Sequence, residues 1–375
     1  MSSSHVPVLR SRRVRYGAPA AAVVVLVGAG PVLHSVTADA HGTLPPRTAA
    51  QLLADVAGAK VKAVSGTVVE TTDLGLPAVP SLGGTSGSRG GSADFSSLVS
   101  GSHTLRVWYA GPDKVRLSLL GQLGESDLVR NGRDVWAWSS HGNTATHWTV
   151  PAGGSDRGLM SGPTHTPVAT PEQAAQAALR AIGPTTRVST DPTAQVAGRP
   201  AYELDLTPRD PRSLVGSVRI AIDGATHVPT RVQVFARGAT SPAFQVGFTS
   251  FSTATPQSSV FGFTPPPGAT VKQGTPETGH APKARSTAGQ APSVVGKGWT
   301  TVLVAHLPAG ATGGATGSGA ALPQALLRSL PSVSGSWGSG RVLRSALFSV
   351  VLTDDGRVAV GAVPPSLLYD ALSRR

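Results

Sequence analysis

The chain has 375 residues, of which only 14% are charged, while glycine (45) and proline (31) are frequent. This composition favours a β-rich protein with long loops, and the length is enough for two domains. The formal net charge is +12, but the arginines form no basic stripe with interleaved aromatic residues, so nucleic acid is not an expected partner. Cysteine is absent, which excludes disulfides, thiolate metal sites and a lipid-modified N-terminal cysteine.

The first forty residues have the features of an export signal. Arg10, Arg12, Arg13 and Arg15 precede an apolar stretch over residues 18–33, and Ala38 and Ala40 are small residues at the spacing that a signal peptidase cleaves. The apolar stretch is short for a spanning helix of about 20 residues. We therefore expect a signal peptide over residues 1–40, with a retained N-terminal anchor as the alternative. Both place the rest of the chain outside the cytoplasm, secreted or in the cell envelope, where its positive charge suits an anionic membrane surface.

Two segments have the start signals of helices. Thr48-Ala49-Ala50-Gln51 is a capping-box pattern, and the apolar residues that follow share one face of a helix over residues 48–60. Thr170 precedes Pro171 at a first helical position, and Gln173 completes a second capping box. We expect this second helix to end at Gly183-Pro184.

Alternation of apolar and polar residues predicts a long series of strands. Val115-Arg116-Leu117-Ser118-Leu119 is one example of an apolar face with a period of two. Turn signals such as Gly111-Pro112-Asp113 and Asn131-Gly132 separate successive segments. We expect an antiparallel meander with strands at residues 63–73, 103–110, 114–120, 126–131, 134–139, 145–150, 186–190, 193–196, 201–207, 216–223, 230–237 and 243–251.

The glycine- and serine-rich segment over residues 76–101 is too long for a tight hairpin. One interpretation is an excursion without regular structure. The other is a flap over the mouth of a cavity, in which Phe95 and Leu98 would touch a bound molecule.

Composition divides the chain into a main domain over residues 41–271, a linker over 272–292 and a small module over 293–375. The linker is rich in proline, glycine, threonine and alanine. In the module we expect an α+β arrangement: a strand at 299–306, a glycine-rich loop at 309–320, a short helix at 323–330, strands at 341–353 and 357–363, and a closing helix at 366–372. Asp354-Asp355-Gly356 is a hairpin signal between the last two strands.

No catalytic signature is present. The sequence has no nucleophile elbow, no dinucleotide fingerprint and no phosphate-binding loop. His141 and His147 flank one predicted hairpin, but no carboxylate joins them at metal-ligand spacing. We expect a protein that is not an enzyme and that carries neither a metal nor a cofactor.

The apolar residues of the predicted sheet favour a container. A sheet of about ten or eleven strands that closes toward a barrel needs either bulky packing or a ligand inside it. Valine, leucine and isoleucine in such a lining suit flexible acyl chains, whereas the tryptophans could equally fill an ordinary β-core. The residues expected to line the interior are Val68, Val115, Leu117, Leu119, Trp136, Trp138, Trp148, Val218, Ile220, Ile222, Phe244, Val246 and Phe248.

This order of elements, ending in Phe261-Gly262-Phe263-Thr264-Pro265-Pro266, resembles the bacterial lipoprotein-carrier superfamily that contains LolA and RseB. Further matching segments are Val64 to Thr67, Leu105 to Tyr109, Pro112 to Arg116 and Ala197 to Leu204, so the resemblance covers residues 48–271. The bias toward alanine, arginine and glycine is similar to actinobacterial members. The resemblance implies a mainly β (α+β) fold: a half-open antiparallel barrel that holds acyl chains, with helices plugging its mouth, and no catalysis.

Two functions follow as expectations. The first is an exported carrier that binds lipid, or the acyl chains of lipoproteins, and moves or sorts them in the cell envelope. The alternative is an envelope-stress sensor of the RseB type, which would detect lipid or misfolded protein and bind a membrane regulator, an anti-sigma partner, through the C-terminal module.

Overall fold

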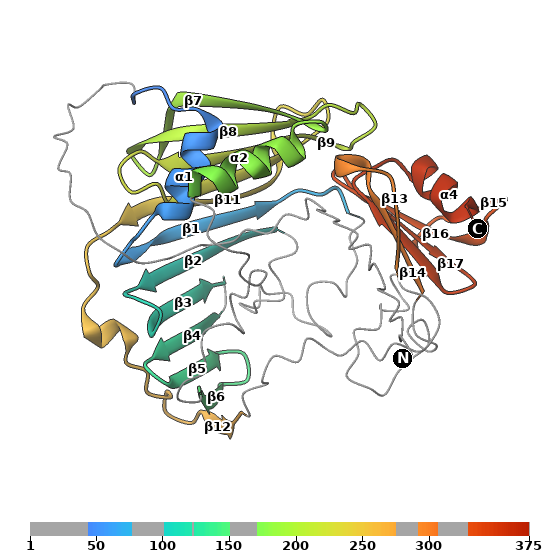
Figure 1. The fold of residues 1–375 in the computed structure, drawn as a ribbon. Helices are drawn as coiled ribbons and strands as arrows, with labels where there is room; N and C mark the ends of the chain where they lie inside the picture. Colours follow the sequence, from blue (N-terminus) through green and yellow to red (C-terminus); the bar gives the residue numbers. More distant parts are fainter. Residues whose placement is uncertain are drawn as a thin grey trace, which may run out of the picture.

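The computed structural model describes residues 44–76, 101–121, 124–150, 171–274, 292–306 and 329–374. Within these ranges the chain forms two β-sheets, a large one with twelve strands and a smaller one with six. Figure 1 shows the large sheet with helices α1 (Ala49–Gly58) and α2 (Pro171–Ile182) on one side of it. The smaller sheet, with helix α4 (Pro365–Ser373) on it, lies next to the large sheet. The flap residues Phe95 and Leu98, the cleavage residues Ala38 and Ala40, and the helix cap Thr170 lie outside the described residues.

The large sheet has the strand order β12-β6-β5-β4-β3-β2-β1-β11-β10-β9-β8-β7. Its end strands β12 and β7 do not pair with each other, so the sheet is an open, mainly antiparallel half-barrel, as expected. Its strands are β1 (Val64–Thr72), β2 (Gly101–Tyr109), β3 (Lys114–Leu120), β4 (Glu125–Asn131), β5 (Asp134–Ser139), β6 (Thr144–Thr149), β7 (Thr186–Val196), β8 (Arg199–Pro208), β9 (Val215–Asp223), β10 (Pro229–Ala236), β11 (Pro242–Ser252) and β12 (Thr270–Gln273).

The sheet consists of two meanders joined through β1 and β11. Strands β1 to β6 pair in chain order, and so do β7 to β11, which we call the first and second halves. Strand β12 pairs with β6 in parallel, which raises the number of strands above the expected ten or eleven. The two predicted strands at residues 186–190 and 193–196 form one strand, β7, with a register shift between Asp191 and Ala194 around Pro192.

Helix α1 (Ala49–Gly58) packs on the second half of the sheet. Thr48 caps it with the predicted capping box, in which the Thr48 side chain accepts from the backbone N–H of Gln51. Leu52 is fully buried against Tyr202, Leu204 and Ile222. Helix α2 (Pro171–Ile182) contacts α1 and has the predicted bounds.

Residues 253–269, which we call the strap, connect β11 to β12 across the first half of the sheet. The strap contains the 3₁₀ helix η3 (Ser258–Phe261), whose Phe261 is fully buried. Arg116 of β3 donates to the backbone carbonyl of Val260 at 3.2 Å. The strap ends at Thr270, where β12 begins, so the domain boundary expected at residue 271 falls inside a strand of the large sheet.

Among the described residues, the C-terminal module is a six-stranded sheet with helix α4 packed on it. Val302, Val342 and Val351 are buried beneath Leu368 of the helix. The predicted strand over residues 341–353 is two strands, because the chain turns after Ser345. The Ser345 hydroxyl donates a hydrogen bond to the carbonyl of Phe348 and accepts one from its N–H. The predicted loop 309–320 and most of the predicted helix 323–330 lie outside the described residues. The elements are β13 (Ser293–Val295), η4 (Gly298–Thr300), β14 (Val302–His306), β15 (Ser332–Gly335), β16 (Gly338–Arg344), β17 (Ser349–Thr353), β18 (Arg357–Gly361) and α4 (Pro365–Ser373).

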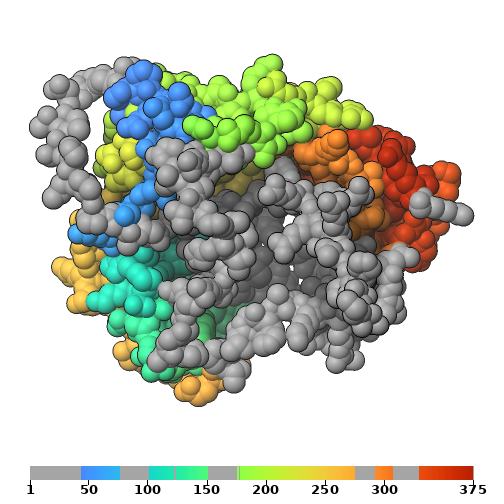
Figure 2. Space-filling model, viewed as in Figure 1, coloured from blue at the N-terminus to red at the C-terminus, as the bar shows by residue number. Residues whose placement is uncertain are grey.

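Among the described residues, three hydrogen bonds at separated points join the C-terminal module to the large sheet or to residues beside its strands. The N–H of Ala346 donates to the carbonyl of Leu74, just after β1, and the N–H of Leu214, just before β9, donates to the carbonyl of Ala362. The indole N–H of Trp299 donates to the hydroxyl of Thr186 at 2.8 Å. Figure 2 shows the module, in orange and red, in contact with the green second half.

Candidate functional site: the inner face of the large sheet

Strand register defines two faces of the large sheet. Directly paired residues lie on the same face, and neighbours along a strand lie on opposite faces. In the first half, Val107, Leu117, Leu128 and Ala137 form one cross-strand row. Val68, Leu105 and Leu119 form the next row. These two apolar rows lie on the same face, which we call the inner face.

The inner face continues into the second half, where it carries helix α1. Val246, Val232, Ile220 and Leu204 form one cross-strand row, and Leu204 is part of the cluster beneath Leu52. A parallel row contains Phe244, Val234, Val218, Leu206 and Val188. The apolar lining and the α1 contact therefore belong to one continuous surface.

The opposite face, which we call the outer face, is polar in the second half. Its central row is Asp205, Arg219, Gln233 and Gln245. Arg219 contacts Asp205 at 3.3 Å, and the Gln233 side chain donates to that of Gln245 at 2.6 Å. In the second half, the central row of the outer face is thus polar, whereas the rows of the inner face are apolar.

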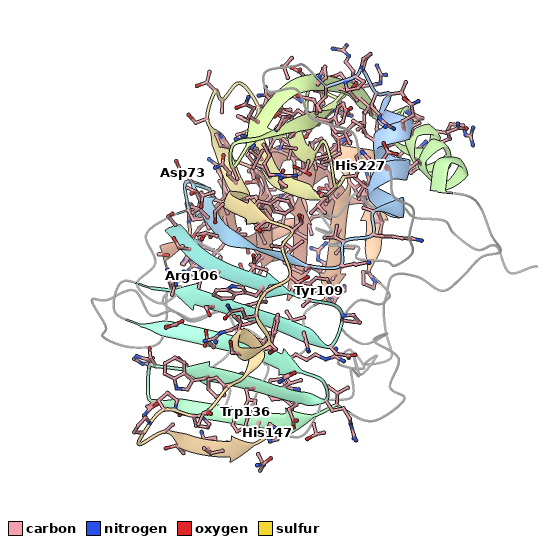
Figure 3. All side chains as sticks on the ribbon, turned by 90° about the vertical axis from the view of Figure 1, so that its left-hand side faces the viewer. Asp73, Arg106, Tyr109, Trp136, His147 and His227 are labelled. Carbon is pink, nitrogen blue, oxygen red and sulfur yellow. The ribbon has the colours of Figure 1, made fainter. Side chains whose placement is uncertain are left out.

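The prediction that Trp136 and Trp138 line the interior is wrong. Trp136 pairs with Val129 and Trp138 with Asp127, and both partners lie on the outer face. The ring of Trp136 is stacked on His147 at 4.3 Å and lies 5.4 Å from Phe263 of the strap. Figure 3 shows Trp136 and His147 side by side on neighbouring strands. The two tryptophans share a face with each other, as their spacing requires, but that face is the one that the strap crosses.

The other predicted lining residues fall into two groups. Ile222 and Leu119 are almost fully buried, Ile222 within the α1 cluster, and Phe248 packs with Val196, Ala201 and Ala221 near a register shift between β1 and β11. These three therefore make core contacts. Residues that the register places on the inner face and that remain partly exposed are Val115, Leu117, Trp148, Val218, Ile220, Phe244 and Val246; Val68 is on the same face and more deeply buried.

The inner face contains a carboxylate–imidazole pair that the sequence analysis missed. Glu70 is two residues beyond Val68 on β1, and it pairs with His103 of β2 and Val246 of β11. Its Oε2 lies 2.8 Å from Nδ1 of His103, with the Glu70 side chain 6% exposed and that of His103 14% exposed. The Thr72 hydroxyl donates to the other carboxylate oxygen. The only sequence signal was a charged residue at a position where the period of two calls for an apolar one.

Among the described residues, no group of three or more histidine, aspartate or glutamate side chains could hold a metal ion. His147, one of the histidines considered from sequence, contacts Asp134 at 2.9 Å on the outer face. No helix within the described ranges is both long enough and apolar enough to cross a bilayer.

Comparisons with known proteins find likenesses among solved structures only. No family model matches the chain, and no curated protein matches it. The MucA/MucB complex structure from Pseudomonas aeruginosa matches with 16% identity over 86% of this chain and 96% of that chain, at a TM-score of 0.40. A structure of MucB alone has 15% identity over 86% and 94%, at a TM-score of 0.36.

A LolA superfamily protein from Nitrosomonas europaea is similar over 58% of this chain and 99% of its own, with 12% identity and a TM-score of 0.20. The sequence resemblance points to the same groups of proteins. Sequence identities and TM-scores this low assign the chain neither a ligand nor a partner.

Proposed function

We propose that this protein is an exported, non-catalytic carrier that binds the acyl chains of lipids or lipoproteins on the inner face of its large sheet. The observation that supports it is the apolar row through Val107, Leu117 and Leu128. These residues are only partly buried. Among the described residues, the packed clusters lie under α1, around Ala201 and in the C-terminal module, and this row belongs to none of them.

Acyl chains fit this surface energetically. Removing each CH₂ group from water contributes about 0.8 kcal/mol, so one long chain could supply most of the affinity before ordering costs. Helix α1 covers the inner face at β8 and β9, while the row through Leu117 lies on the first half of the same face. A bound chain would therefore lie along the first half and reach toward α1.

The test is lipid binding by the full chain purified from a bacterial envelope, measured by native mass spectrometry with lipid extraction. We expect a stoichiometric lipid or acylated peptide in the unmodified protein and its loss in Leu117→Asp, because a charge on the inner face opposes burial of a hydrocarbon chain. Gln233→Asp is the matched control, since it adds the same charge on the outer face. A folded Leu117→Asp protein that keeps its lipid would contradict the proposal.

A second candidate function is a sensor that binds a membrane regulator through the C-terminal module. The observation that favours it is an apolar row on the face of the small sheet away from α4, formed by Val294, Leu303, Val360, Val350 and Leu343. Val294 is 41% exposed and Leu303 is 40% exposed. A partner recovered by cross-linking in the envelope should be lost with Leu303→Asp. If the substitution leaves recovery of the partner unchanged, the sensor function is contradicted and only the carrier function remains.

A further inference from the structure

The most unusual group on the inner face is the buried carboxylate of Glu70. Along its row, Leu204, Ile220, Val232 and Val246 are apolar, and the row then ends in Glu70 and His103. A buried carboxylate is costly unless hydrogen bonds and opposite charge compensate it. Glu70 therefore places a carboxylate in line with four apolar residues of the same row.

The compensation that Glu70 receives is partial. One oxygen accepts from the Thr72 hydroxyl and the other contacts a ring nitrogen of His103. An ionised carboxylate has about four lone-pair sites, so both oxygens keep room for a further donor. The Glu70 carboxylate therefore keeps acceptor sites at the edge of an apolar surface.

Ser126 adds a second polar group at the same end of the sheet. It pairs with Leu119 on the inner face, close to the end of β3 and the start of β4. Its hydroxyl oxygen is buried and, among the described residues, has no hydrogen-bond partner. Glu70 and His103 lie near the end of β1 and the start of β2, so all three belong to one end of the half-barrel.

We propose that Glu70, held by His103 and Thr72, is a head-group site that selects amphiphiles carrying a cationic or neutral N–H donor next to the acyl chain, and that disfavours anionic head groups. This inference rests on the proposed acyl-chain binding. The hydrocarbon would lie along the apolar rows, and its ammonium or amide N–H would donate to the Glu70 carboxylate. A fatty acid or phosphate monoester placed there would bring two negative charges together in a poorly solvated site.

The overall charge of the protein opposes the expected preference for a cationic amphiphile. A formal net charge of +12 attracts anions to the protein in general. Preference for a cationic amphiphile therefore runs against the long-range field and has to come from a local group.

The test compares two probes of equal chain length, tetradecylamine and tetradecanoate, binding to the full chain at pH 7 in isothermal titration calorimetry. We expect the unmodified protein to bind the amine about tenfold more tightly, the scale of one hydrogen bond to a charged group. Glu70→Gln should abolish this preference while keeping affinity for the hydrocarbon. Glu203→Gln is the matched control: it removes a carboxylate paired with Arg231 at 3.1 Å on the outer face, and should leave the preference unchanged.

The outcomes separate this inference from the proposed function. Equal affinities, or tighter binding of tetradecanoate by the unmodified protein, would overturn the head-group site while acyl-chain binding stands. An amine preference that persists in folded Glu70→Gln would overturn it as well. Failure of both probes to bind the unmodified protein would remove the proposed function and the inference together. The comparison of the two probes on the unmodified protein needs no substitution, so it tests the head-group site even if a variant fails to fold.

Discussion

Arg116 joins two parts of the chain that are 144 residues apart, because its guanidinium donates to the backbone carbonyl of Val260 in the strap. The same guanidinium is paired with Asp127 of β4, whose side chain is 3% exposed, and its centre lies 5.8 Å from the ring centroid of Trp108. Ser118 also donates to Asp127. One arginine therefore holds the strap on the outer face and neutralises a buried carboxylate.

Replacing Arg116 by methionine should lower the free energy of unfolding by about 3–5 kcal/mol, because a buried pair that loses one partner leaves an uncompensated charge. Urea unfolding followed by tryptophan fluorescence measures the loss. The double variant Arg116→Met, Asp127→Asn should recover part of it, since the charge is then gone. A double variant no more stable than the single one would show that the strap contact, and not the charge, dominates.

Leu52→Ala should loosen α1 from the sheet. Leu52 is fully buried in the cluster with Tyr202, Leu204 and Ile222, so its truncation should cost about 2–5 kcal/mol of unfolding free energy. Leu53→Ala is the control, because Leu53 is only partly buried and packs at the margin of the same cluster. Equal losses in thermal or urea unfolding for the two variants would contradict this placement of the helix.

Asp223 should make the free energy of unfolding depend on pH in the acidic range. Arg199 donates two hydrogen bonds to its carboxylate, at 2.6 and 3.0 Å, and Thr226 donates two more. Burial alone would raise the pKa of Asp223, but the hydrogen bonds from Arg199 and Thr226 outweigh burial and lower the pKa below its ordinary value.

Since the folded-state pKa is lowered, the stabilisation is complete above the unfolded-state pKa of about 3.9 and is lost as the pH falls through the folded-state value. Asp223→Asn should therefore destabilise the protein at pH 7, and this penalty should shrink as the pH falls below about 3.9, measured by urea unfolding at pH 7 and near pH 3. The control is Asp113→Asn, whose side chain is 65% exposed in its pair with Arg130. An equal penalty for Asp223→Asn at both pH values would refute the linkage.

Trp299→Phe should weaken the attachment of the C-terminal module. It removes the indole N–H that donates to the buried Thr186 hydroxyl, a loss of about 1 kcal/mol. Differential scanning calorimetry should show the module unfolding earlier relative to the large sheet. Trp337→Phe serves as control, because Trp337 is buried inside the module and stacks on Tyr369. Separate transitions that shift only with Trp337→Phe would argue against a role for Trp299 at the contact.

Local physics determined a large part of this protein from its sequence. The capping box at Thr48, the start of α2 at Pro171 and the turn before Gly356 depend on neighbouring residues, and each lies where the pattern predicts. The period of two also establishes that Leu117 and Leu119 share a face, because side chains alternate along any strand.

Only the tertiary structure decided whether such a shared face is the inner or the outer face of the sheet, and which residues lie beside it. Trp136 and Trp138 share a face, but the pairing of β5 with β4 places that face on the outside, beneath the strap. Glu70 meets His103 only through the register of β1 and β2, across 33 residues. Register and strap position arise from contacts between segments far apart in the chain, and no local pattern encodes such contacts.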